Sequence, residues 1–118
     1  MTEQEKMLSG QMDFAGVPGV LAARKRAKEM CQRFNRTAVQ DPEAGTDLLR
    51  ELLGRMGEEI SIQPMFWCDY GFNIQMGSHV EINHNCVILD CAQVTFGDHV
   101  FIGPNCGFYT AGHPLDAP

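Results

Sequence analysis

The stretch that most constrains the fold of this chain is a six-residue repeat within residues 70–106. An apolar residue begins each unit and a second apolar residue follows four positions later, as in Phe96 with Val100 and Ile102 with Cys106. Gly or Asn often follows the first apolar residue, and both residues suit tight turns. A repeat this short indicates a stack of small structural units. The earlier units begin at Tyr70, Met76, Ile82 and Ile88.

This spacing predicts short parallel strands separated by turns, with three strands in each triangular coil of about 18 residues. Two additional residues between Ala92 and Phe96 interrupt the repeat. The alternative is a series of hairpins in a β-sandwich, which we favour less because no Asn-Gly or Asp-Gly pair joins the strands. In the coiled arrangement we expect these side chains inside: Ile74, Val80, Ile82, Cys86, Ile88, Val100, Ile102 and Cys106.

Several segments, taken in order along the chain, carry a resemblance to a known family. They are residues 5–10, 34–35, 68–74, 82–90, 97–106 and 109–116. The segment 97–106 resembles the hexapeptide repeat of acyltransferases, and together the segments resemble maltose and galactoside O-acetyltransferases. The resemblance implies a mainly β fold, namely a left-handed parallel β-helix preceded by a small α-helical N-terminal region. It also implies acetyl-CoA as co-substrate and a homotrimer with each active site between two subunits.

The distribution of charge divides the chain in two. All nine Lys and Arg residues lie between Lys6 and Arg55, and none occurs from Ile60 to Pro118. We therefore expect a helical cap of the maltose acetyltransferase type over residues 1–57 and an incomplete β-helix over residues 58–118. A solenoid end exposes unpaired strand edges, so a cap at the first coil is physically useful.

Within residues 1–57 the sequence predicts two or three helices. One covers residues 3–10, a second begins at Pro18, and a third begins with Asp41 as N-cap before Pro42. The second has an apolar stripe formed by Val20, Ala27, Cys31 and Phe34. The third has a leucine stripe at Leu48, Leu49, Leu52 and Leu53. We interpret a basic face on the second helix as solvated, in preference to a phosphate site; it holds Arg24, Lys25, Lys28 and Arg33.

Composition argues against several classes of protein. The net charge of −6 disfavours a nucleic-acid partner. No run of about 18 apolar residues is present, so we expect no membrane span. The five cysteines form no Cys-x-x-Cys pair, and the acidic N-terminus lacks an apolar signal core, which favours reduced thiols in a cytoplasmic protein. We expect no metal site, because the histidines and cysteines do not form a closed ligand set.

Four residues are candidates for chemistry. His113 follows the repeat in a loop, where a neutral imidazole suits a general base, although a surface histidine is the alternative. The resemblance places the catalytic histidine at His113 and acceptor-binding residues at Asn83, Asp69 and Asp13. Asn83 is alternatively a structural residue of a left-handed turn. Cys91 stands where some galactoside-type members carry Asp, which favours the maltose type.

These observations predict an acetyl-CoA-dependent O-acetyltransferase that acts on a sugar hydroxyl of the maltose, glucose or galactoside type. Two alternatives stay open: a non-catalytic hexapeptide-repeat module, and an acyltransferase of the same fold with another acceptor, such as an antibiotic or a nodulation oligosaccharide. Family members continue with further coils, so we expect the chain to be truncated after the His113 motif. The coenzyme-binding residues are then expected beyond residue 118, and the 118-residue chain is expected to be inactive and poorly stable.

Overall fold

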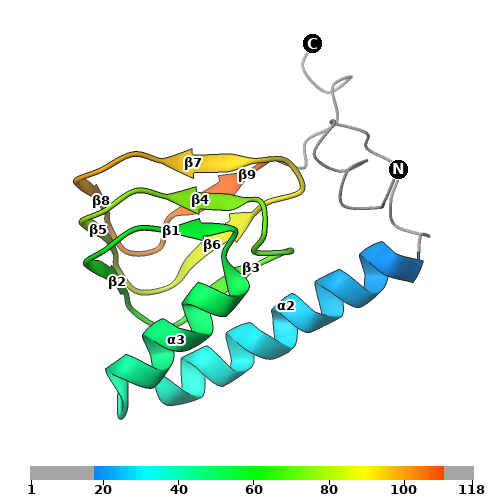
Figure 1. The fold of residues 1–118 in the computed structure, drawn as a ribbon, viewed down its shortest axis with the longest axis horizontal. Coiled ribbons are helices and arrows are strands. Elements are labelled where there is room, and N and C mark those ends of the chain that lie inside the picture. Colours follow the sequence, from blue (N-terminus) through cyan, green and yellow to red (C-terminus); the bar gives the residue numbers. More distant parts are fainter. Residues whose placement is uncertain (1–17, 111–118) are drawn as a thin grey trace.

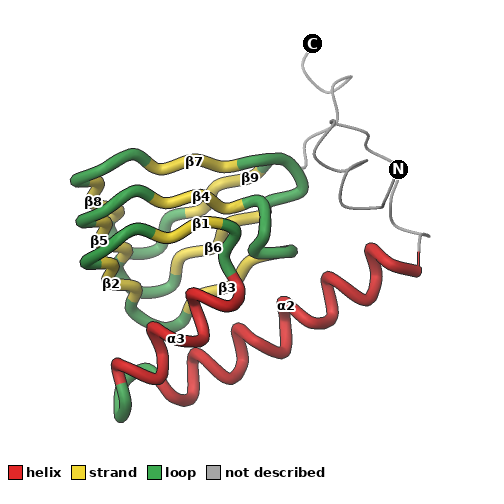
Figure 2. The backbone as a smooth tube through the Cα atoms, viewed as in Figure 1, coloured by secondary structure: helices red, strands yellow, loops and turns green. Residues whose placement is uncertain are grey.

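Two helices lie across one end of a stack of three-sided coils (Figure 1). The computed structural model describes residues 18–110, so the helix predicted at residues 3–10 lies outside the described residues. Helix α2 spans Pro18–Thr37 and helix α3 spans Pro42–Leu52. Both helices lie against the coil that holds β1, β2 and β3 (Figures 1 and 2). This is the position that a cap on the first coil requires.

The strands form three parallel sheets of three strands each. The sheet orders are β1-β4-β7, β2-β5-β8 and β3-β6-β9, so each sheet takes one strand from every coil. Because every pair is parallel, the β-sandwich of antiparallel hairpins is ruled out for this region. The strand bounds are β1 Arg55–Met56, β2 Ile60–Ile62, β3 Phe66–Cys68, β4 Ile74–Met76, β5 Val80–Ile82, β6 Cys86–Leu89, β7 Val94–Phe96, β8 Val100–Ile102 and β9 Gly107–Tyr109.

Each coil contains 20 residues, so the predicted length of about 18 is wrong. The register shows the true period, because Ile60 pairs with Val80, and Val80 pairs with Val100. The additional residues lie at the corner that follows the third strand of a coil, at 69–73 and again at 90–93. Tyr70 therefore belongs to a corner and does not begin a strand. The first strand, β1, begins at Arg55, within the range that we expected to be the helical cap.

The predicted interior is confirmed, with a difference between coils. Five of the eight side chains are buried, with at most 2% exposed: Ile74, Val80, Ile82, Cys86 and Ile88. The other three lie in the last described coil and are partly buried against the same core: Val100, Ile102 and Cys106. Phe96 and Phe108 meet edge to face in that coil, with ring centroids 5.3 Å apart. Apolar side chains thus fill the centre of the triangle along the described stack.

The helices form as their sequences predict. The Asp41 side chain caps α3 by accepting a hydrogen bond from the Ala44 N–H at 3.1 Å, and Pro42 occupies the first turn. The apolar stripe of α2 is buried at Val20, Ala27, Cys31 and Phe34. Phe34 meets Phe66 of β3 edge to face, with ring centroids 6.4 Å apart. Burial of these stripes fixes both helices on the first coil.

Tight turns of regular shape join the first, second and third strands of each coil. A residue with φ near +58° recurs at one corner as Glu59, His79 and His99. The corresponding residues at the next corner are Asn85 and Asn105, with φ of 60° and 59°. The left-handed position therefore comes two residues after the Gly or Asn that we had associated with positive φ. Asn83 is not itself left-handed; the left-handed residue of its turn is Asn85.

Candidate acceptor site

The structure places the predicted site residues at different parts of the coil. Asp69 begins the wide corner between β3 and β4, whereas Asn83 lies in the tight turn between β5 and β6. One side of the triangle, a strand of roughly 10 Å, separates these two corners. Asp13 and His113 lie outside the described residues. Within one chain, the described residues therefore do not bring Asp69 and Asn83 together.

A buried carboxylate organises the wide corner. Asp90 is fully buried, and its two oxygens accept hydrogen bonds from four backbone N–H groups. Asp69 and Tyr70 donate to Oδ1 at 3.1 and 2.9 Å, and Gly71 and Asn73 donate to Oδ2 at 2.8 and 3.2 Å. The Asp90 side chain thus satisfies amides that the strand ladder cannot reach, which explains why this corner accommodates additional residues.

Two features of the Asp90 environment shift the pKa of its carboxyl in opposite directions. Burial raises the pKa of the Asp90 carboxyl to about 6, while the hydrogen bonds from Tyr70, Gly71 and Asn73 lower the pKa. The Asn73 side chain adds a hydrogen bond from its Nδ2 to the Asp90 carbonyl oxygen at 2.8 Å. Asp90 is therefore a structural group that holds the backbone of the corner in place.

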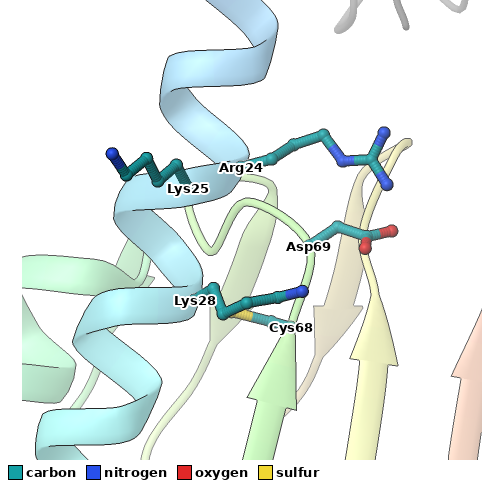
Figure 3. A pocket seen from close by; sticks show the side chains of 5 residues that line it. All are labelled: Arg24, Lys25, Lys28, Cys68 and Asp69. Atoms are coloured by element: carbon teal, nitrogen blue, oxygen red, sulfur yellow. The ribbon is translucent and has the colours of Figure 1, made fainter.

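Asp69 faces a hollow between the wide corner and α2. A cavity of about 260 Å³ is lined by Arg24, Lys25, Lys28, Cys68 and Asp69. Arg24 and Lys28 extend from α2 toward the side that carries Asp69, whereas Lys25 points away (Figure 3). The basic side chains are exposed, as we expected for a solvated face, but they also border this cavity. Basic side chains and a carboxylate thus border the same space, which suits a polar ligand.

Cys91 and Tyr70 complete the surroundings of Asp69. The Cys91 thiol donates a hydrogen bond to Asp69 Oδ2 at 3.5 Å, and burial raises the pKa of Cys91 to about 11. Burial also raises the pKa of Tyr70 to about 12. The guanidinium carbon of Arg24 lies 6.0 Å from the centroid of the Tyr70 ring. At neutral pH the thiol and the phenol are therefore both protonated, which leaves Asp69 as the acidic group of this hollow.

Asn83 presents a polar side chain at a solvated turn. Its Oδ1 accepts a hydrogen bond from the His84 N–H at 2.7 Å, and its own N–H donates to the Ile102 carbonyl in the next coil at 3.0 Å. The His84 ring nitrogen Nδ1 lies 2.8 Å from the Pro64 carbonyl oxygen. These contacts hold Asn83 in the turn, where the residue is half-exposed.

Residues 18–110 contain neither a metal-binding cluster nor a membrane-spanning helix. No group of three or more His, Cys, Asp or Glu side chains in this range is arranged to hold a metal ion. Neither of the described helices combines the length and the apolar character that a membrane crossing requires.

The chain is similar to several known proteins. Residues 6–57 match the maltose acetyltransferase hexapeptide capping motif. The chain is 47% identical over 115 residues to nodulation protein L of Rhizobium meliloti (strain 1021), which covers 98% of this chain and 63% of that protein. Over nearly its whole length the chain is similar to hexapeptide-repeat acetyltransferases. The resemblance seen in the sequence is confirmed, and with it the left-handed parallel β-helix.

Solved structures of the family superpose over nearly all of the chain. A maltose O-acetyltransferase from Clostridium difficile 630 has a TM-score of 0.91 at 39% identity, covering 99% of this chain and 63% of that chain. A hexapeptide-repeat-containing acetyltransferase of Vibrio cholerae O1 biovar eltor, in complex with acetyl coenzyme A, has a TM-score of 0.88 at 42% identity with the same coverage. The chain thus spans somewhat less than two thirds of the length of these relatives.

We predicted a site role for Asp69 from the sequence but did not predict the groups around it. Asp90 lay within a segment that carried the resemblance, yet we assigned it no role. The sequence did contain a signal for this role. An acidic residue that directly follows a buried strand needs hydrogen-bond donors nearby, and the N–H groups of a turn can supply them. We regarded Arg24 and Lys28 only as solvated cations, since a helical period cannot show which strand the helix faces.

Proposed function

We propose that the complete protein transfers an acetyl group from acetyl-CoA to a sugar hydroxyl. The observation that carries this proposal is the likeness, over 99% of this chain, to an acetyltransferase in complex with acetyl coenzyme A. The cavity beside Asp69 supports a polar acceptor, because a carboxylate accepts strong hydrogen bonds from sugar hydroxyls. In this proposal Asp69, Asn83 and Asp13 orient the acceptor, and the coenzyme binds mainly through residues beyond 118.

His113 is the proposed general base. A neutral imidazole takes the proton of the acceptor hydroxyl while the hydroxyl oxygen attacks the thioester carbonyl. The carbon–sulfur bond then breaks, and coenzyme A leaves as a thiol after gaining that proton. His113→Ala in the complete protein is expected to lower kcat by roughly 10²–10⁴-fold. Near-normal turnover of this variant in a coenzyme A release assay would remove His113 from the mechanism.

Asp69 provides a separate test of acceptor binding. Asp69→Asn should raise the KM for the sugar more than the KM for acetyl-CoA, because in this proposal the carboxylate contacts the acceptor and does not contact acetyl-CoA. Asp98→Asn is the matched control, since Asp98 is an exposed carboxylate on a tight turn of the same β-helix. Equal effects of the two substitutions on the sugar KM would contradict the role of Asp69.

The positions of Asp69 and Asn83 support an active site shared between copies of the chain. They lie on different corners, so a site that uses both residues takes them from two subunits, as in the proposed homotrimer. Co-expressed Asp69→Ala and Asn83→Ala chains should then recover activity at low sugar concentration, because some interfaces of the mixed assembly carry both native residues. Mixed assemblies no more active than the single variants would argue against a shared site.

Several sugars are candidates for the acceptor. The likeness to a maltose O-acetyltransferase favours maltose or glucose, and the likeness to nodulation protein L retains the alternative of a nodulation oligosaccharide. Comparing kcat/KM for maltose, glucose, a galactoside and a nodulation oligosaccharide tests these acceptors directly. A cytoplasmic location is part of the proposal and would be tested by cell fractionation.

A further inference from the structure

The helical cap and the β-helix meet at a pair of cysteines. Cys31 of α2 and Cys68 of β3 are both buried, with 0% and 8% of their surfaces exposed, and neither is in a disulfide. Their sulfur atoms lie 3.7 Å apart. A disulfide requires a sulfur–sulfur distance of about 2.05 Å, so only a small side-chain movement separates this pair from a covalent bond.

Neighbouring contacts hold the two cysteines opposite each other. The Asn35 side chain donates a hydrogen bond to the Phe66 carbonyl at 3.2 Å and accepts one from the Phe66 N–H at 2.8 Å. Cys31 lies four residues before Asn35, which is about 6 Å along a helix. Cys68 lies two residues after Phe66, which is about 6.6 Å along a strand. Because these spacings match, the Asn35–Phe66 contact fixes the register that brings the sulfurs together.

Only one of the two sulfur-bearing side chains borders the cavity beside Asp69. Cys68 lines this space, whereas Cys31 is not among the lining residues. Figure 3 shows the Cys68 side chain beneath Lys28, whose ammonium group extends toward Asp69. A small molecule in the cavity therefore reaches Cys68 first, and Cys31 then lies next to the sulfur that has reacted.

We propose that Cys31 and Cys68 form a reversible disulfide when the protein meets a small-molecule disulfide. The contact with Cys31 and burial raise the pKa of the Cys68 thiol, so the first step requires alkaline solution. There the Cys68 thiolate attacks one sulfur of that molecule, forms a mixed disulfide and releases one small thiol. The Cys31 thiolate then attacks the Cys68 sulfur, forms the protein disulfide and releases the second small thiol. The two protein thiols lose two electrons and two protons, and the small disulfide is reduced to two thiols.

This cross-link is a modification site between the cap and the β-helix, and it does not depend on the proposed acetyl transfer. It would join α2 to the strand that leads into Asp69, so the bond lies at the border of the candidate acceptor site. Reducing agents reverse the reaction by the same exchange steps.

The test is to oxidise the native protein with bis(2-hydroxyethyl) disulfide, alkylate the remaining thiols under denaturing conditions and map the cysteines by mass spectrometry. Trypsin combined with a glutamate-specific protease separates the cysteines well, because Cys31 falls in peptide 30–33 and Cys68 is the only cysteine of peptide 60–81. We expect these two peptides to be linked, two hydrogens lighter than the sum of the reduced peptides, and to separate after reduction. Oxidised wild-type protein without this linked pair, or with Cys68 joined mainly to another cysteine, overturns the proposal.

Single variants test the order of the two steps. In Cys31→Ser, Cys68 should keep one mercaptoethanol group because the second thiol is missing. In Cys68→Ser, Cys31 should stay reduced because it does not border the cavity. Cys86→Ser is the matched control, since Cys86 is a buried cysteine elsewhere in the β-helix, and it should cross-link as the wild type does. A mercaptoethanol group found on Cys31 in Cys68→Ser would contradict the proposed order.

Discussion

The coils of this β-helix turn at two kinds of corner, tight and wide, which are held in different ways. At the wide corner of residues 69–73, one buried carboxylate, Asp90, accepts four backbone N–H groups. At the tight turns, backbone groups of successive coils satisfy each other. The His79 N–H donates to the Glu58 carbonyl and the His99 N–H donates to the Ser78 carbonyl, both at 2.9 Å.

The difference shows where a repetitive fold can hold a specific site. A tight turn has the same backbone conformation and hydrogen-bond pattern in successive coils. Its outer side chains are exposed to solvent, as with the stacked rings of His79 and His99, whose centroids lie 4.8 Å apart. The wide corner departs from the six-residue repeat and packs against α2, with Val20 and Tyr70 buried together. Polar and charged groups therefore gather where the repeat is interrupted and a second element covers the coil.

Replacing the carboxylate of each kind of corner should give the largest difference in unfolding free energy. Asp90→Ala leaves four backbone N–H groups without their acceptor in a buried site, so we expect a loss of about 3–5 kcal/mol of unfolding free energy. Asp98→Ala is the control, because Asp98 is exposed and accepts one hydrogen bond from the Ser78 N–H at 2.7 Å. Its expected cost is below about 1 kcal/mol. Urea unfolding of both variants measures the contrast, and similar losses would show that Asp90 does not organise its corner.

A pair of glycines offers the next contrast. Gly71 has φ +87°, and a Cβ at this position would lie 2.6 Å from the Leu52 carbonyl oxygen and from Leu52 Cδ1. Gly71→Ala should therefore cost about 2–4 kcal/mol through backbone strain and overpacking. At Gly97, on a tight turn, a Cβ meets nothing within 4 Å, so Gly97→Ala should change stability by less than about 0.5 kcal/mol. Thermal unfolding that ranks the two variants in the reverse order would contradict this packing of α3 on the corner.

The smallest expected effect concerns the exposed histidines. His99→Asn keeps a residue that tolerates the left-handed conformation, as Asn85 and Asn105 do at the neighbouring corner. The substitution removes the ring stack with His79, which is solvent-exposed, so we expect a change within about 0.5 kcal/mol. A loss above about 1 kcal/mol in urea unfolding would show that the histidine stack contributes to the stability of the tight turns.

The sequence predicted much of the fold because its signals are local and repeated. Apolar residues at fixed spacing predicted parallel strands and named side chains such as Ile74 and Ile88 that are buried. The coil length was wrong because a six-residue frame cannot show which residues belong to a corner held by a side chain. Asp90 appeared in the sequence as one more polar residue after a strand, and only its four donors reveal its structural role.

The sequence by itself determined the architecture, because local periodicity and capping residues depend only on neighbours along the chain. Helix α3 is an example: Asp41, Pro42 and the leucine stripe specify it without reference to the rest of the molecule. Tertiary structure alone decided which elements meet. It placed Asp69 and Asn83 at separate corners, set Arg24 and Lys28 beside Asp69, and brought Cys31 within 3.7 Å of Cys68. These relations depend on how a helix lies across a strand tens of residues away, and the packing of buried side chains fixes that geometry.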